Sequence, residues 1–320
     1  MNPRQEQILL RLAASQAAVS GDTLAGELGL SRTGIWKHIQ ALRKQNINIQ
    51  ALPGKGYQLI GDAMTAATLK ARLNTAVLGR HIEILAEIDS TNAAAMRAAE
   101  EGAEEGMVVI ATRQTAGRGR RGRLWHTFPE QALAMSILLR PALPPQHVPQ
   151  LSLVTALALH DALSPYAPSL RIKWPNDLLA DGHKLAGILT EMRAEPGLVH
   201  AVVIGIGINL QKPEHGWPED IGQPVCDLSS LAGRHISRLE AATRTLDALD
   251  RRYRQYLQSG FEPIRHDWWQ AHAANNRKVR VHDGLEYIEG IAEALDHDGA
   301  LLVRTNAGIQ RIIAGDLEIA

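Results

Sequence analysis

The sequence predicts an α+β protein in three parts, which we place at residues 1–62, 63–273 and 274–320. The first part combines helical periodicity with one short hairpin, and the second alternates apolar strands with helices. The third consists of short strand-like segments separated by turns that contain glycine. A chain of 320 residues is long enough to form two or three domains, each with a buried core.

The bulk composition narrows the possible classes of function. Lysine and arginine balance aspartate and glutamate at 34 each, so any binding of nucleic acid must rest on local charge. The single cysteine, Cys226, excludes an intrachain disulfide and fits a reducing compartment. The N-terminus does not read as a signal peptide, and no apolar stretch reaches membrane-spanning length. We therefore expect a cytoplasmic protein with no membrane segment.

The N-terminal part begins with three predicted helices. Apolar periodicity indicates a first helix over residues 3–18 and a short second helix over residues 24–28. A glycine turn follows, and Ser31 is placed to cap a third, longer helix. A short helix, a glycine turn and a longer helix with one polar face are the pattern of a helix-turn-helix.

The third helix and the segment after it supply the expected DNA contacts. Residues 47–52 and 57–60 alternate like strands around a Pro-Gly-Lys-Gly turn and predict a wing hairpin. Residues 1–62 hold seven Lys and Arg against four Asp and Glu, a net charge of +3 that suits phosphate contact. The alternative is a winged helix that binds protein or only packs. The residues expected to contact DNA are Ser31, Arg32, Thr33, Trp36, Lys37, Gln40 and Lys55.

The elements of the second and third parts follow from the same patterns. Strands are expected where apolar residues alternate or run together, and helices where they repeat every three or four residues. The expected central strands are residues 81–88, 107–111, 132–139, 171–173, 184–191 and 202–210. The expected helices are residues 68–79, 93–101, 150–163, 239–258 and 261–273. The last part should form a small β-barrel from strands at residues 278–281, 287–295, 300–304 and 309–313.

The most unusual stretch of the central part is Gly117–Trp125. Its first seven residues hold four arginines and three glycines. Glycine lets the backbone approach a ligand closely, and arginine offers planar donors that suit phosphate or carboxylate. Such a loop can close over a phosphate-containing ligand and exclude water. The basic run by itself favours an RNA-binding patch or a solvated loop, so its neighbours must decide.

Polar side chains stand at the ends of several central strands. The stretch Asp89–Asn92 can cap the next helix or hold the polar head of a ligand, and by itself it favours capping. Further along, Pro175 stops a strand and is followed by Asn176 and Asp177. Lys184 opens the next strand.

These residues favour one kind of chemistry over several others. Cations on loops around a buried sheet, one adjacent carboxylate and no cluster of His and Cys suggest electrostatic catalysis on a phosphorylated species, with Mg²⁺ at Asp177. The chain has no Walker loop, which argues against a P-loop ATPase. Gly205 and Gly207 lack the third glycine of a dinucleotide fingerprint, so they are poor support for NAD binding.

Taken together, five motifs resemble those of the biotin–protein ligases in order and spacing. They are Gly117–Arg123, Asp89–Asn92, Lys173–Asp177, Lys184–Leu189 and Gly205–Asn209. With the N-terminal segments Ser31–Ile39 and Pro53–Tyr57, the chain resembles the bifunctional bacterial ligases that also repress the biotin operon. The resemblance covers nearly all of the chain.

The resemblance implies a fold and an activity. The fold would be a winged helix-turn-helix, a central mixed sheet like that of class II synthetases and biotin–lipoate ligases, and an SH3-like barrel. The activity would be that of a biotin–[acetyl-CoA-carboxylase] ligase: ATP and Mg²⁺ convert biotin to biotinyl-5'-adenylate, and biotin passes to a lysine of biotin carboxyl carrier protein. The adenylate would also be the corepressor, promoting a homodimer that binds operator DNA of biotin synthesis genes.

The resemblance also assigns roles to residues. Biotin would be held by Ser90, Thr91, Asn92, Gln114, Arg118, Gly119, Arg120 and Lys184. ATP and the adenylate would be held by Arg120, Arg123, Trp125, Asn176 and Asn209, with Mg²⁺ at Asp177. The residues expected to take part in catalysis are Lys184, Arg118, Arg120 and Arg123.

Two segments depart from the family pattern. After Trp125 the family usually has Ser-Pro followed by a glycine and an Asn or Leu, whereas residues 126–132 read His-Thr-Phe-Pro-Glu-Gln-Ala. A second loop, residues 211–227, is rich in Pro and Gly and has no residue-by-residue match. Two alternatives stay open, a lipoate-type ligase and a winged-helix regulator with no ligase activity.

Overall fold

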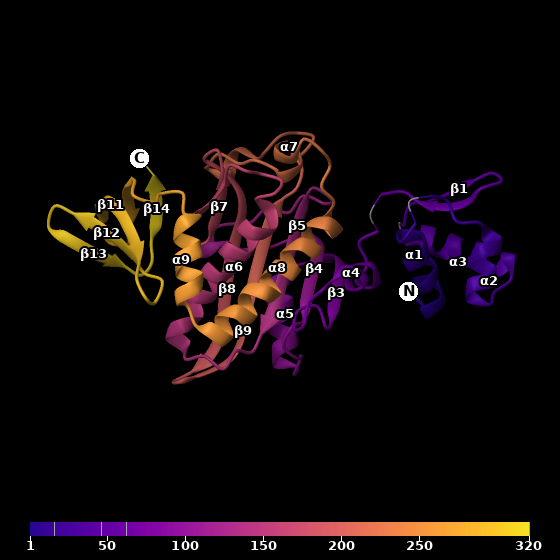
Figure 1. Ribbon diagram of the computed structural model, residues 1–320, viewed down its shortest axis with the longest axis horizontal. Coiled ribbons are helices and arrows are strands. Elements are labelled where there is room, and N and C mark those ends of the chain that lie inside the picture. Colours follow the sequence, from indigo (N-terminus) through magenta and orange to yellow (C-terminus); the bar gives the residue numbers. More distant parts are fainter. Residues whose placement is uncertain (16, 46, 62, 320) are drawn as a thin grey trace. The chain divides into compact units, whose positions relative to one another are not determined.

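The computed structural model describes residues 1–15, 17–45, 47–61 and 63–319 (Figure 1). The predicted end of the first domain at Asp62 and the chain end at Ala320 lie outside the described residues. The chain forms two compact units, Met1–Leu73 and Asn74–Ala320, which are described one at a time.

The first unit is a three-helix module with a hairpin and one further helix. Its elements are α1 (Pro3–Ala13), α2 (Gly21–Leu28), α3 (Arg32–Lys44), β1 (Ile49–Leu52), β2 (Gly56–Leu59) and α4 (Ala66–Arg72). Ile8, Leu24 and Ile39 are fully buried at its centre. The predicted helix over residues 3–18 was too long, because the chain leaves α1 at Ala13 and continues toward the hairpin.

The hairpin is fixed to the helical part by Val19. The backbones of Val19 and Tyr57 exchange hydrogen bonds of 2.8 and 2.9 Å. Gly56 is needed beside them, because its φ is 111° and a β-carbon there would collide with the Val19 carbonyl. The predicted wing is therefore a β-hairpin locked against the segment that precedes α2.

A seven-stranded mixed sheet forms the centre of the second unit. Its order is β3-β4-β5-β9-β8-β7-β6, and only the β3–β4 pair is parallel. The strands are β3 (Ile82–Ile88), β4 (Val108–Gln114), β5 (Ala132–Leu139), β6 (Leu170–Lys173), β7 (Asp177–Ala180), β8 (His183–Glu195) and β9 (Leu198–Asn209). Strand β7 was not predicted, since it has four residues and lies within a turn region.

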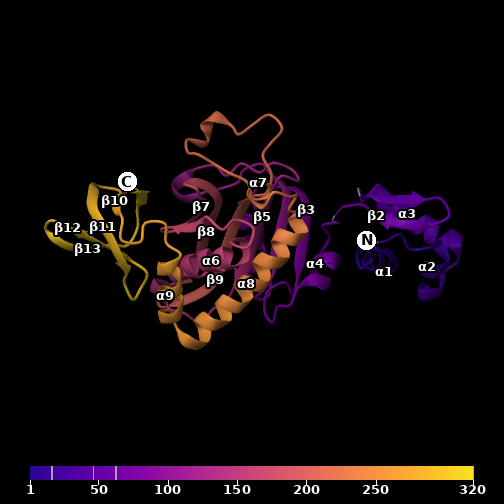
Figure 2. The same cartoon turned by 45° about the horizontal axis from the view of Figure 1, so that its top comes forward.

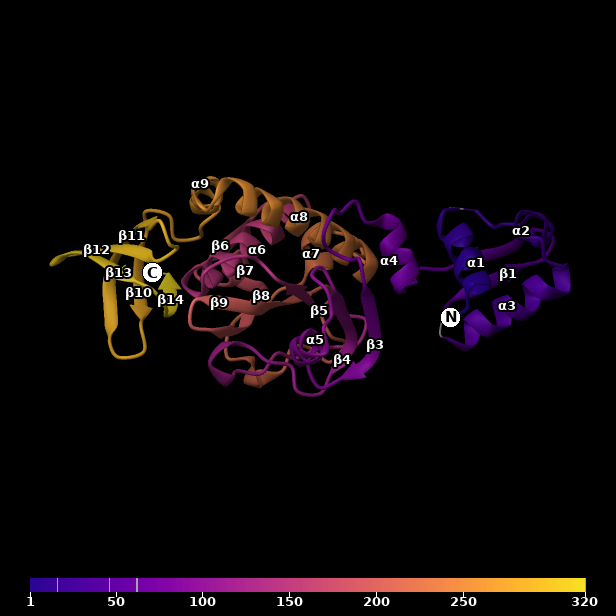
Figure 3. The same cartoon turned by 90° about the horizontal axis from the view of Figure 1, so that it is seen from below.

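The helices of this unit are α5 (Thr91–Glu100), α6 (Val148–Leu163), α7 (Leu228–Ala232), α8 (Arg238–Ser259) and α9 (Glu262–Gln270). Of these, α5, α6 and α8 pack on the central sheet, and α9 packs on α6 and α8. Figure 3 shows α5 and α8 on opposite sides of the sheet. Figure 2 shows the segment between β9 and α7 as a loop that stands out from the rest of the unit. Among the described residues, no helix is long and apolar enough to cross a membrane.

One carboxylate explains why the predicted helix over residues 68–79 is shorter in the structure. Helix α4 ends at Arg72. In the second unit, the buried Asp250 accepts hydrogen bonds from the backbone N–H groups of residues 76–78. Burial opposes ionisation of Asp250, but these three donors and Arg254 hold its pKa below the ordinary value. The backbone donors that a helix would use are therefore committed to a side chain.

The C-terminal part is a five-stranded antiparallel sheet in the order β13-β12-β11-β10-β14. The strands are β10 (Lys278–His282), β11 (Tyr287–Leu295), β12 (Leu301–Thr305), β13 (Gly308–Ile312) and β14 (Asp316–Ile319). Four were predicted, and β14 is an additional strand. The indole Nε1 of Trp174 donates to the carbonyl of Gly299 at 3.2 Å, which ties this sheet to the central one.

Candidate active site

A cavity of about 750 Å³ opens over strands β8 and β9 of the central sheet. Its walls come from the first loop, Gly117–Trp125, from the second loop, residues 211–227, and from strand β14. This volume lies in the range of pockets that enclose small-molecule ligands. All of the residues predicted to bind biotin, ATP or Mg²⁺ line it.

The first loop is folded as a short hairpin. The Gly119 N–H donates to the Arg123 carbonyl at 2.7 Å, and the Trp125 N–H donates to the Gly117 carbonyl at 3.0 Å. Arg121 turns the chain with a φ of 55°. The Gly119 amide, expected to bind biotin, is therefore engaged within the loop.

The loop ends with the indole of Trp125 resting on the sheet. A β-carbon on Gly207 would overlap the indole, so only glycine leaves room for the ring at that position. The Trp125 Nε1 is buried and has no hydrogen-bond partner among the described residues. Lys184 Nζ lies 5.8 Å from the ring centroid. The indole is thus seated between the sheet and the cavity, with one free donor.

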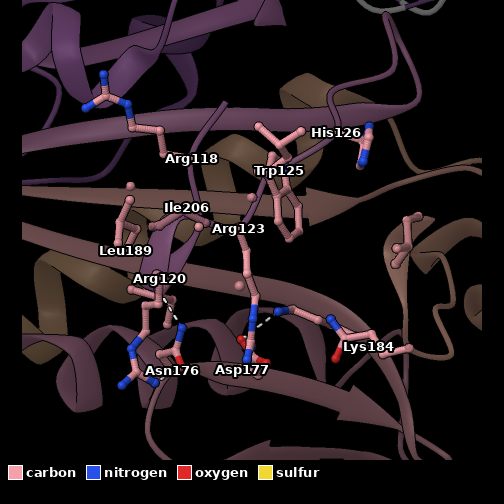
Figure 4. Close-up of a pocket in the computed structure, with 18 of the residues that line it drawn as sticks. Arg118, Arg120, Arg123, Trp125, His126, Asn176, Asp177, Lys184, Leu189 and Ile206 are labelled. Carbon is pink, nitrogen blue, oxygen red and sulfur yellow. Dashed lines mark hydrogen bonds and ion pairs between the residues drawn. The ribbon is translucent and has the colours of Figure 1, made fainter. Parts of the chain in front are cut away.

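Four polar residues form what we call the charged cluster: Arg120, Asn176, Asp177 and Lys184 (Figure 4). Arg120 donates to Asn176 Oδ1 at 3.0 Å, and Lys184 Nζ lies 2.9 Å from Asp177 Oδ1. The side chains of Lys184 and Asp177 are each only 15% exposed, so water screens this pair weakly. Burial lowers the pKa of Arg120, although Asp316 and Asp177 nearby favour its charged form.

A second set, Thr91, Asn92, Gln114 and Ser136, forms what we call the neutral network. Gln114 Oε1 accepts from the Thr91 N–H at 2.8 Å and from the Thr91 hydroxyl at 3.1 Å. Ser136, fully buried on β5, lies 2.7 Å from the Thr91 hydroxyl and 2.6 Å from Asn92 Oδ1. Asn92 Nδ2 donates to Glu191 at 2.7 Å. Amides and hydroxyls therefore hold one another in place along this wall.

The stretch Asp89–Asn92 divides between capping and lining. Ser90 caps α5 by accepting from the Ala93 N–H, and its side chain also lines the cavity. Asp89 does not line the cavity, and hydrogen bonds from Arg97 lower its pKa to about 2. The cap predicted from the sequence and the ligand-facing surface are therefore both present.

The remaining predicted residues lie around the cavity without joining either set. Arg118 is exposed, and Figure 4 shows it pointing away from Lys184. Arg123 donates to Asp316 at 2.5 Å, and Arg121 donates to the same oxygen at 3.1 Å. Asn209 donates to the Lys184 carbonyl at 3.4 Å.

The sequence did not reveal several contributors to the site, among them Ser136 of the neutral network, Asp316 and the contacts of the second loop. Burial opposes ionisation of Asp316, but the hydrogen bond from Arg123 and the charges of the loop arginines keep its pKa below the ordinary value. The second loop holds the backbone of Lys184 on both sides, with hydrogen bonds from the Lys184 N–H to Pro224 and from the Cys226 N–H to Lys184. These partners are distant in sequence from the residues they contact.

The predicted DNA contacts lie on one helix and the hairpin of the first unit. Ser31 caps α3 by accepting from the Gly34 N–H at 3.0 Å. Arg32, Thr33, Trp36 and Lys37 are exposed on α3, Gln40 is partly buried there, and Lys55 is exposed at the hairpin turn. Arg32 also forms an exposed ion pair with Asp22 at 3.0 Å.

Comparison with known families defines the class of protein. Residues 85–209 match the Biotin/lipoate A/B protein ligase family, and residues 276–319 match the Biotin protein ligase C terminal domain. Residues 4–58 match a family described as HTH domain. The class is therefore a ligase of the biotin or lipoate type joined to a helix-turn-helix, and the predicted fold is confirmed.

Full-length relatives narrow this class. The chain is 38% identical to the bifunctional ligase/repressor BirA of Bacillus subtilis, over 99% of this chain and 98% of that protein. It is 33% identical to BirA of Escherichia coli, over 97% and 96%. A structure of biotin protein ligase from Aquifex aeolicus in complex with biotin and ATP matches with a TM-score of 0.64 and 27% identity, covering 75% of this chain and 99% of that one. The chain belongs to the family of bifunctional biotin–protein ligases and repressors, which confirms the resemblance seen in the sequence.

Proposed function

We propose that this chain activates biotin with ATP as biotinyl-5'-adenylate and then transfers biotin to a lysine of biotin carboxyl carrier protein. The observation that carries the proposal is that Thr91, Asn92 and Gln114 of the neutral network line the same cavity as the charged cluster. Biotin has the same division, since its ureido ring is polar but neutral and its carboxylate must meet the phosphates of ATP. The match to the Biotin protein ligase C terminal domain and the Aquifex aeolicus ligase solved with biotin and ATP support biotin over lipoate as the acid.

In the first step the biotin carboxylate oxygen attacks the α-phosphorus of ATP. An O–P bond forms, the bond from the α-phosphorus to its bridging oxygen breaks, and diphosphate leaves. Two anions must approach each other, so the site has to offset both charges and align them. Lys184 and Arg120 are placed for this role, with Arg118 and Arg123 as the further loop cations.

Loss of the existing ion pair is part of this proposal. Lys184 forms an ion pair with Asp177 in the structure. In the reaction, the biotin carboxylate and the α-phosphate would bind Lys184 together with Asp177 or in its place. Asp177 also offers a single carboxylate beside the cavity, which suits a Mg²⁺ ion held mainly by nucleotide phosphates and water. When bound there, Mg²⁺ would offset the charge of the triphosphate.

The second step needs the adenylate to survive until the acceptor arrives. A lysine amine attacks the acyl carbon, the bond to the phosphate oxygen breaks, AMP leaves and the amine loses a proton. The adenylate is a mixed anhydride that water would hydrolyse, so a cover over it is required. The first loop and the Trp125 indole, which line the cavity, support a covering role for this loop.

The direct test is adenylate formation from purified protein. With α-labelled ATP and Mg²⁺, biotin should give labelled biotinyl-adenylate, and lipoate should give no comparable product. Absence of biotinyl-adenylate would reject the proposal, and equal product from lipoate would favour the lipoate-type alternative. Addition of a carrier domain should then release labelled AMP and leave biotin on its acceptor lysine.

We further propose that the first unit represses biotin synthesis genes, with the adenylate as corepressor and a homodimer as the DNA-binding form. A cap at Ser31 and an exposed row of Arg32, Thr33, Trp36 and Lys37 on α3 suit entry of this helix into the major groove. A dimer would present two such helices to paired half-sites. In gel-shift titrations, biotin with ATP should tighten binding to the operator. Equal binding with and without both ligands would contradict this coupling.

A further inference from the structure

The segment that departs from the family pattern has an unusual backbone at one residue. Glu130 lies in the left-handed region, with a φ of 63°, where a side chain is unfavourable and glycine is preferred. Its carboxylate accepts from the Arg238 guanidinium at 2.7 Å. Glu130 thus adopts a disfavoured backbone conformation and supplies the counter-charge of a buried cation. This combination indicates that the Glu130–Arg238 contact has a structural or functional role.

Arg238 joins two parts of the cavity wall from outside the cavity. It follows the N-cap of α8, and its side chain is 9% exposed, against 72% for Glu130. Besides Glu130 it donates to the Thr112 hydroxyl on β4 at 2.9 Å. We call Arg238, Glu130 and Thr112 the Arg238 clasp. The clasp therefore connects strand β4 to the segment that follows the first loop.

The two parts joined by the clasp also meet at the cavity wall, where Gln114 lines the cavity. Gln114 lies two residues after Thr112 on β4, and Thr127 lies three residues before Glu130. Gln114 Nε2 donates to the Thr127 hydroxyl at 3.0 Å. Because the clasp fixes the strand on one side and the segment on the other, it sets the geometry of this hydrogen bond and of the neutral network that Gln114 completes.

The same segment also supports the second loop. The Gln131 carbonyl accepts from the N–H groups of Leu210 and Gln211 at 2.9 and 3.0 Å. The Phe128 ring, which lines the cavity, meets Trp217 of the second loop edge-on at a centroid distance of 6.0 Å. Displacement of residues 128–131 would therefore move both an inner wall and the loop across the cavity.

From this geometry we infer that Arg238 is a positioning residue for the biotin pocket, acting through Glu130 and Thr112 without touching the ligand. The inference rests on the proposed function, since it names the part of the substrate whose binding depends on the clasp. Biotin affinity depends on the clasp because Gln114, which belongs to the neutral network and lines the cavity, is held by Thr127 of the clasped segment. ATP affinity depends on the clasp far less, because the contacts that hold the charged cluster, Arg120 to Asn176 and Lys184 to Asp177, involve none of the clasp residues.

The test compares two variants that break the clasp from opposite ends. Arg238→Met keeps the aliphatic stem and removes the charge, and Glu130→Gln removes the charge at a largely exposed position. Each should weaken biotin binding, measured by calorimetry on the full chain, by about tenfold, and leave the KM for ATP within about twofold. The double variant should also lose about tenfold, because both substitutions break one interaction.

Arg251→Met, an exposed arginine on the same helix, is the matched control and should leave biotin binding unchanged. Unchanged biotin affinity in either folded clasp variant, or equal weakening of biotin and ATP, would overturn the inference. If Arg238→Met fails to fold, Glu130→Gln decides the question, since its carboxylate is mostly in solvent. A wild-type chain that binds no biotin would instead reject the proposed function, which keeps the two failures distinct.

Discussion

The neutral network and the charged cluster form two walls of one cavity, with Ser136 buried behind the first, but the two are built differently. In the neutral network, buried amides and hydroxyls are bonded to one another, so the wall is preformed for a polar, uncharged group. In the charged cluster, Lys184 pairs with Asp177 and Arg120 with Asn176, and these contacts must be shared or exchanged when anions arrive. The neutral network would recognise the ligand by shape and hydrogen bonding, and the charged cluster would offset the charge of the reacting anions.

This difference predicts which measured quantity each wall controls. A preformed hydrogen-bonding wall contributes equally to the ground state and the transition state, so damage to it should raise a KM. Cations that meet charge developing between a carboxylate and a phosphate stabilise the transition state more than the ground state, so damage to them should lower kcat beyond any loss of biotin affinity. Three of the four changes below test that division, and the change at His272 tests stability apart from it.

Removing the Lys184 charge should have the largest effect. Lys184→Met should slow adenylate formation about 10³-fold, which corresponds to about 4 kcal/mol of lost transition-state stabilisation. Single-turnover measurement with labelled ATP gives the rate of this step directly. Lys278→Met, which removes an exposed lysine on β10, is the control and should leave the rate unchanged. A variant within tenfold of wild type would refute the charge-handling role.

Stability should respond to acid through a residue outside both walls. His272 is buried against Trp268, and burial lowers its pKa to about 4 from the ordinary value of 6.5. The folded state therefore keeps His272 neutral, and stability is lost as pH falls from about 6.5 to about 4, by about 3 kcal/mol in total. Urea unfolding of wild type and His272→Leu at several pH values measures this loss. The variant should show a flatter pH dependence, and an identical slope in both proteins would contradict the assignment.

Displacing the Trp125 indole should give a smaller loss of activity. A β-carbon in Gly207→Ala would overlap the ring, and overpacking of this kind costs about 2 kcal/mol. We expect adenylate formation to fall about 30-fold, measured as kcat/KM for ATP. Gly26→Ala, where a β-carbon meets open space, is the control. Full activity in Gly207→Ala would show that contact between the Trp125 indole and Gly207 is not required for adenylate formation.

Cutting one link of the neutral network should give the smallest change. Ser136→Ala removes a hydroxyl that lies 2.7 Å from Thr91 and 2.6 Å from Asn92, and should raise the KM for biotin about tenfold, or about 1.4 kcal/mol. The KM for ATP should not change. Thr155→Val removes a buried hydroxyl in α6 that bonds only within its helix, and should affect neither KM. A fall in kcat without a rise in the biotin KM would contradict the assignment of biotin binding to the neutral network.

Local patterns in the sequence were enough to predict much of this architecture. Apolar periodicity and alternation located the helices of the first unit and most strands of the second. Stretches such as Asp89–Asn92 could be read because their residues lie side by side in the chain. Strand β14 was missed because four residues at the chain end carry too short a pattern, and α1 ends early because Val19 pairs with Tyr57.

The missing parts of the site depend on contacts between distant residues. Ser136 could have been noticed as the one polar residue in the apolar strand 132–139, but its partners lie more than forty positions earlier. Asp316 gave no local signal at all, because the arginines it pairs with are far away in the chain. The role of Glu130 was equally hidden, since Arg238 lies on a helix 108 positions later.

The division between the walls can be tested most directly with two ligands that differ only at the acid group. Calorimetry would compare biotin with its uncharged alcohol analogue on wild type, Lys184→Met and Ser136→Ala. We expect Ser136→Ala to weaken both ligands by the same factor, whereas Lys184→Met should weaken biotin and leave the alcohol nearly unchanged. Equal weakening of both ligands by Lys184→Met would contradict the division between the walls.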